Sequence, residues 1–176
     1  EEIKENFPYK VIEVDEVEAD DMVGVLCDYT QEFGQYEEVM IISGDKDFAQ
    51  LQKYKNINQY SPITRKFMKE PTPRKQLMEL ILKGDTADGV PNVLSGDNVF
   101  VDGERQTPLR KNKIDELTND PKAVGEEVYR NYLRNKKLID LTETPEPLKE
   151  KIIYNYEQQD KTGNKNKVFP YLVEKR

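Results

Sequence analysis

The chain has 176 residues, of which 36% are hydrophobic and 35% charged, and 34 acids against 27 bases give a net charge of −7. This length accommodates one domain, or a compact core with an appendage. Because there is no histidine and only one cysteine, Cys27, the sequence excludes a disulfide framework, zinc sites, Ser-His triads and Cys-His pairs.

No membrane or secretion signal is visible. No apolar run approaches the roughly 18 residues that a membrane helix needs. The start, Glu1–Lys4, lacks the basic and apolar regions of a signal peptide. A single cysteine suits a reducing compartment. We therefore expect no membrane partner.

The first 72 residues alternate between strand and helix patterns. After the acidic run Glu18–Asp21, apolar residues recur at helical spacing from Met22 to Tyr29, which predicts a helix that ends near Gly34. The apolar run Val39–Ile42 predicts a strand buried on both faces. Further strands are expected at residues 8–14, 57–60 and 63–68, with a turn at 61–62, and a short helix at 48–53. This alternation indicates an α/β fold with a parallel sheet and a mixed edge.

Beyond residue 72 the pattern becomes helical. Residues 90–109, rich in Asn, Gly, Asp and Pro, predict a long irregular segment. Helices are expected to open near residue 110 and to cover residues 74–83, 121–135 and 145–156, the last capped by Thr144. We therefore divide the chain into an α/β core at residues 1–72 and a helical region at residues 73–176.

Three acidic motifs stand out by their positions in this pattern. They are Glu18-Ala19-Asp20-Asp21, which opens a helix, Asp45-Lys46-Asp47, which follows a strand, and Asp85-Thr86-Ala87-Asp88, which follows a helix. Ligands bind at the carboxyl ends of the strands in parallel α/β sheets. The first two motifs are therefore expected to point into one crevice, with the third closing over it.

Seven carboxylates in one crevice repel one another, and either protonation or divalent cations would relieve the repulsion. Oxygen-only ligands favour Mg²⁺ or Mn²⁺ over zinc. Paired ions about 3.5–4 Å apart commonly activate water and stabilise the leaving oxygen of a phosphodiester. Each motif alone also has a purely structural explanation, because residues 18–21 suit a helix N-terminus, and Asp85 and Asp88 suit a turn.

Taken together, the motifs resemble the 5′-nuclease superfamily, which includes the 5′-nuclease domains of bacterial DNA polymerase I and the flap endonucleases. The resemblance includes Phe48, Gln50 and Leu51 after the second motif and Gly89-Val90-Pro91 after the third. The motif spacing and the strand pair after the second motif are most similar to the ribonuclease H of T-even-type bacteriophages. The resemblance extends over nearly the whole chain and is strongest over residues 17–91.

The resemblance implies a 5′-nuclease or PIN-like core followed by a helix–hairpin–helix variant that grips duplex DNA. It implies a catalytic centre with two Mg²⁺ (or Mn²⁺) ions. It assigns Glu18, Asp20, Asp21 and Asp45 to the more tightly held ion, and Asp47, Asp85 and Asp88 to the second, partly through water. The implied activity is 5′-3′ exonuclease or flap-endonuclease cleavage of RNA–DNA hybrids and of 5′-flap or duplex DNA, which removes primers during phage replication.

The sequence also departs from the family pattern. The family places further metal-binding aspartates before the first motif, and nothing upstream of Glu18 supplies them. The resemblance therefore implies that an N-terminal part is missing, and if those aspartates are required, this chain alone is inactive. The usual Gly-x-Gly hairpin after the third motif is also absent. The implied setting is the cytoplasm of a phage-infected bacterium, with partners such as a single-stranded-DNA-binding protein.

Basic residues at and after the third motif are the candidate phosphate contacts: Lys83, Arg105, Arg110, Lys111 and Lys113. Backbone contacts of this kind give salt-sensitive binding without sequence readout. For any single lysine, a solvated helix face is the simpler explanation. Two alternatives to the implied activity stay open, a PIN-like ribonuclease and a non-catalytic DNA-binding fragment.

Overall fold

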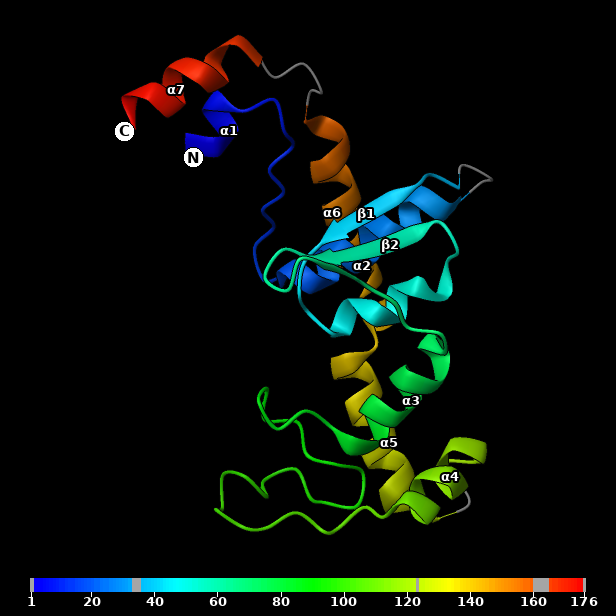
Figure 1. The fold of residues 1–176 in the computed structure, drawn as a ribbon. Coiled ribbons are helices and arrows are strands. Elements are labelled where there is room, and N and C mark those ends of the chain that lie inside the picture. Colours follow the sequence, from blue (N-terminus) through cyan, green and yellow to red (C-terminus); the bar gives the residue numbers. More distant parts are fainter. Residues whose placement is uncertain (1, 33–35, 123, 160–164, 176) are drawn as a thin grey trace.

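The structure, a computed structural model, describes residues 2–32, 36–122, 124–159 and 165–175 (Figure 1). The elements are α1 (Glu2–Asn6), α2 (Ala19–Gln31), β1 (Val39–Ile42), η2 (Asp47–Lys53), β2 (Ile57–Ser61), β3 (Lys66–Met68), α3 (Pro73–Lys83), α4 (Lys111–Asn119), α5 (Glu126–Ile139), η3 (Leu141–Glu143), α6 (Glu146–Gln158), η4 (Lys165–Lys167) and α7 (Val168–Glu174). No helix among these residues is long and apolar enough to cross a membrane.

A mixed sheet in the order β1-β2-β3 confirms the predicted α/β class. β1 pairs in parallel with β2, where Ile41 lies beside Gln59. β2 pairs antiparallel with β3, where Ser61 lies beside Lys66. The turn between these two strands covers residues 62–65 and is longer than predicted. β3 therefore begins at Lys66, three residues later than the predicted start at residue 63.

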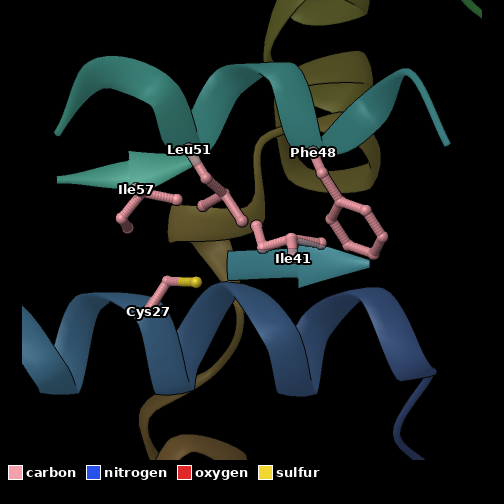
Figure 2. Close-up of a cluster of buried hydrophobic side chains, with 5 residues drawn as sticks. All are labelled: Cys27, Ile41, Phe48, Leu51 and Ile57. Atoms are coloured by element: carbon pink, nitrogen blue, oxygen red, sulfur yellow. The ribbon is translucent and has the colours of Figure 1, made fainter. Parts of the chain in front are cut away.

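The core of the sheet lies between α2 and the 3₁₀ helix η2 (Figure 2). Ile41 of β1 packs in one cluster with Cys27 of α2 and with Phe48 and Leu51 of η2. Figure 2 shows α2 and η2 on opposite sides of β1. The predicted burial of Cys27 is confirmed, and desolvation raises the pKa of its thiol to about 11. These contacts place the loop between β1 and η2, which carries the second acidic motif, at one end of the sheet.

β1 is buried on one face only, so the prediction of a strand buried on both faces is wrong. Ile41 is buried, whereas Met40 and Ile42 are 49% and 70% exposed. Among the described strands β1 has β2 as its sole neighbour, which leaves it at the edge of the sheet. Because successive side chains of a strand point to opposite faces, the face that carries Met40 and Ile42 is the exposed one.

The strand predicted at residues 8–14 is also absent. Instead, the backbone N–H and C=O of Val11 pair with the side-chain amide of Gln159, at 2.8 and 2.7 Å. Asn155 of α6 donates to the carbonyl oxygen of Glu13 at 3.1 Å. These side chains form hydrogen bonds with backbone groups that would otherwise pair with a neighbouring strand. The segment therefore runs beside α6 in an irregular conformation.

The helical region matches the predicted helices with shifted boundaries. α5 begins at Glu126 rather than 121, directly after Gly125 at φ +119°, and ends at Ile139 rather than 135. α6 begins at Glu146, one residue after the predicted start. α2 ends at Gln31, and Gly34 lies outside the described residues.

Two buried asparagines of α5 hold the irregular segment that follows α3. The side-chain amide of Asn131 donates to the carbonyls of Val93 and Ser95, at 3.1 and 3.2 Å. That of Asn135 donates to Ile81 and Pro91, at 2.8 Å each. These bonds satisfy carbonyl groups that have no strand or helix partner. They tie the segment after the third acidic motif to α3 and α5.

Candidate metal centre

All seven predicted carboxylates line one pocket of about 500 Å³. They come from the start of α2, the loop between β1 and η2, and the turn after α3: Glu18, Asp20, Asp21, Asp45, Asp47, Asp85 and Asp88. The other lining residues are Gly89 and five apolar residues, Leu80, Val90, Leu138, Ile139 and Leu141. None of the described residues that line the pocket is basic. The pocket therefore concentrates negative charge against partly apolar walls.

Two groups of carboxylates are close enough to hold a cation each. Oxygen atoms of Asp20, Asp45 and Asp47 lie within 4.8 Å of one another, and so do those of Asp47, Asp85 and Asp88. Asp47 belongs to both groups, which differs from the division that the resemblance implied. Glu18 and Asp21 line the pocket without belonging to either group.

Local hydrogen bonds orient several of these side chains. Asp45 Oδ1 accepts from the backbone N–H of Asp47 at 3.0 Å, and Asp85 Oδ1 accepts from that of Ala87 at 2.8 Å. Turn formation therefore uses one oxygen of each carboxylate and leaves the other for a ligand. Glu18 occupies the N-cap position of α2 but makes no side-chain capping bond. Helix capping and turn formation therefore explain only part of the role of these acidic residues.

Thr144 contacts a pocket carboxylate, Asp21, although it does not line the pocket itself. The sequence predicts that Thr144 caps α6, but its hydroxyl lies 2.8 Å from Asp21 Oδ1 and 3.1 Å from the carbonyl oxygen of Leu141, and its one proton is shared between these two acceptors. Thr144 is buried and lies 123 residues from Asp21. Because no local pattern links such distant residues, the sequence contained no signal for this contact.

Crowding of the carboxylates perturbs their protonation. The pKa of Asp47 is raised to about 6, first by desolvation and then by the charges of Asp45, Asp85 and other neighbours. The pKa of Asp20 is also raised, first by desolvation and then by Asp45. A bound cation would reverse the electrostatic part of both shifts. The donor set and its excess charge therefore fit hard divalent cations.

We expect Asp47→Asn to stabilise the metal-free chain, and increasingly so as the pH rises. The folded-state pKa of about 6 exceeds the value of about 3.9 in an unfolded chain, so the folded state holds this proton more tightly. The free energy of unfolding therefore falls as pH rises from about 4 to about 6, and asparagine removes this loss. Melting temperatures in EDTA at pH 4.5, 6 and 7.5 test this. A constant difference between the two proteins across pH would contradict it, and Asp102→Asn, at an exposed site, is the control.

The predicted phosphate contacts lie outside this pocket. Lys83 Nζ pairs with Glu79 at 2.8 Å and Lys113 with Glu116 at 2.9 Å. Arg105 is exposed in the irregular segment, and Arg110 and Lys111 are exposed at the start of α4. Their side chains therefore lie on surfaces of the helical region rather than among the carboxylates.

Comparisons with known proteins agree with this architecture. Residues 72–176 match the family described as T4 RNase H, C terminal, and residues 1–79 match the 5′-3′ exonuclease N-terminal resolvase-like domain. The chain is 37% identical over 124 residues to "Ribonuclease H" of Enterobacteria phage T4, an alignment that takes in 68% of this chain and 40% of that protein. The chain thus spans well under half the length of this relative.

The fold is also similar to a solved structure, the T5 D15 protein co-crystallised with metal ions. The TM-score is 0.52 at 18% identity, over 82% of this chain and 61% of the other. At that identity the likeness concerns the fold. The family match at residues 72–176 takes in more than half of the sequence. The chain therefore belongs to the T4 RNase H family, within the 5′-nuclease superfamily.

Proposed function

We propose that this chain supplies the metal centre of a 5′-3′ nuclease of the ribonuclease H or flap-endonuclease type. The observation that carries the proposal is the convergence of seven carboxylates from three separate segments on one pocket without a basic residue among its described lining. Family membership supports the same reaction class, since the T4 relative is named a ribonuclease H.

The pocket would hold two Mg²⁺ or Mn²⁺ ions that share Asp47. Asp20 and Asp45 would hold one ion, Asp85 and Asp88 the other, and Glu18 and Asp21 would act at the edge of the first group. Bound ions would activate water and stabilise the leaving oxygen of a phosphodiester. The protein's own part is to orient these carboxylates, which the hydrogen bonds to Asp21, Asp45 and Asp85 support.

The proposed substrates are RNA–DNA hybrids and 5′-flap or duplex DNA. Lys83, Arg105, Arg110, Lys111 and Lys113 are the proposed backbone contacts, in the region that would form the helix–hairpin–helix variant. Contacts to phosphates release counterions, so binding should weaken steadily as salt rises. An affinity that does not change with salt would count against these assignments.

Cleavage assays test the proposal directly. We would assay this chain, and the longest polypeptide that its source gene encodes around it, on RNA–DNA hybrid, 5′-flap DNA and single-stranded RNA, with Mg²⁺, Mn²⁺ or EDTA. Metal-dependent cleavage of the first two substrates from the 5′ end is expected. Cleavage of single-stranded RNA alone would favour a PIN-like ribonuclease. Binding without cleavage by both polypeptides would favour a non-catalytic DNA-binding module.

A further inference from the structure

Gln59 is a buried glutamine in the middle of β2, with a side chain only 1% exposed. A polar side chain at such a site is costly unless it is hydrogen-bonded. Its amide nitrogen donates to the carbonyl of Ser43 at 3.1 Å and also to the carbonyl of Asp45. Both carbonyls belong to the loop that follows β1 and carries the second acidic motif. Gln59 therefore bonds the backbone of this loop from the neighbouring strand.

A second glutamine fixes the orientation of this amide. Gln52 of η2 donates to Gln59 Oε1 at 3.4 Å and to the carbonyl of Met68 at 3.2 Å. The oxygen of Gln52 accepts from the backbone N–H of Glu70 at 2.9 Å. With its oxygen engaged, Gln59 directs its nitrogen toward the loop. The two amides thus connect β3, η2 and the loop in one network.

The position of this loop decides where two carboxylates lie. Ser43 Oγ accepts from the backbone N–H of Asp45 at 3.1 Å, and Asp45 Oδ1 accepts from that of Asp47 at 3.0 Å. The carboxylate of Asp45 is therefore coupled to the backbone that Gln59 holds. Asp47 is the member common to both candidate cation groups. A shift of this loop would move ligands of both groups together.

We propose that Gln59 is a positioning residue for the metal centre, which sets cation affinity through the loop at residues 43–47 without touching the cation. The proposal rests on the proposed function, since it needs a cation in the pocket. Replacing a residue that orients metal ligands without binding the metal itself typically changes metal affinity by about 10–100-fold. Such a change is separable from a general loss of stability.

The test measures the affinity of the chain for Mn²⁺ by titration calorimetry at neutral pH. Melting temperatures in EDTA are measured for the same proteins. Gln59→Leu keeps the size of the side chain but removes its hydrogen bonds, and it should weaken Mn²⁺ binding at least tenfold. The control is Gln31→Leu, because Gln31 is also buried and its amide also bonds a backbone carbonyl, that of Glu37 at 3.1 Å. Gln31 does not line the pocket. Its variant loses this hydrogen bond but should keep the parent affinity.

A second variant covers the case in which Gln59→Leu does not fold. Gln52→Leu removes the support of the Gln59 amide at a half-buried position and should weaken Mn²⁺ binding by a smaller factor. Unchanged affinity in folded Gln59→Leu, or in Gln52→Leu if the first variant does not fold, would overturn the proposal. An equal loss in Gln31→Leu would do the same. If the parent chain does not bind Mn²⁺ while it is folded, the proposed function fails and this inference falls with it.

Discussion

Asp45→Asn should abolish cleavage by a nuclease that contains this chain, while nucleic-acid binding stays within a few-fold of the parent. Asp45 lies in the first candidate cation group and also orients the backbone of Asp47, which belongs to both groups. Asparagine keeps the shape of the side chain but removes the charge that a divalent cation needs. Metal ions contribute several kcal/mol to the stabilisation of such transition states, so a loss of about 10³-fold or more is expected.

The measurement pairs cleavage rates on 5′-flap DNA and RNA–DNA hybrid with binding in EDTA. Asp15→Asn is the matched control, because Asp15 is exposed three residues before the first motif and does not line the pocket. It makes the same change of charge and should keep parental activity. If Asp45→Asn lost binding together with activity, the role assigned to its carboxylate would be wrong. Mn²⁺ titration of the variant should show at least one weakened site.

Gly84→Ala, next to the pocket residue Asp85, should cause a large loss of stability. Gly84 follows α3 with φ +69° and ψ −177°, a conformation that is essentially restricted to glycine. A Cβ atom there would lie 2.3 Å from the carbonyl oxygen of Val90 and 2.7 Å from that of Pro91. Backbone strain costs about 1–3 kcal/mol, and overpacking adds about 1–3 kcal/mol.

The turn around Gly84 is closed by a hydrogen bond of 2.7 Å from Val90 N–H to the carbonyl of Asp85. An added Cβ would push this turn apart and displace Asp85 and Asp88, so Gly84→Ala should also weaken Mn²⁺ binding. Gly103→Ala is the matched control, because Gly103 has the same φ of +69° but no atom within 4 Å of an added Cβ. Melting temperature and Mn²⁺ affinity would be measured for both. Equal losses in the two variants would show that the clash with Val90 has no effect.

The predicted elements were most reliable where local pattern and packing agree. The helix after the first motif and the position of the strand at Val39–Ile42 agree with the prediction, because both segments contribute to the core that Cys27, Ile41 and Leu51 form. The burial of the strand does not agree, since only one of its faces is buried. The sequence pattern predicts the start of α5 at residue 121, five residues before Glu126, where the helix begins. Val124 packs into the helical core before the helix begins, so its apolar character resembles a helical position.

The strand predicted at residues 8–14 failed for a different reason. β-branched composition there satisfies a strand pattern, yet Asn155 of α6 and Gln159, which follows α6, bond the backbone of this segment. These two residues lie more than 140 positions further along the chain than the backbone groups that they bond. Strand formation requires a neighbouring strand, and no local pattern reports whether one is within reach.

The sequence by itself determined the residue types of the site. With no histidine and one cysteine, only carboxylates remain as plausible ligands, and their three motifs already indicated hard divalent cations. Tertiary structure alone decided how they meet. Asp47 belongs to both carboxylate groups, Thr144 reaches Asp21 across 123 residues, and Gln59 holds the loop from the next strand. These relations depend on contacts between distant segments, whereas motifs and periodicity describe only what each segment does locally.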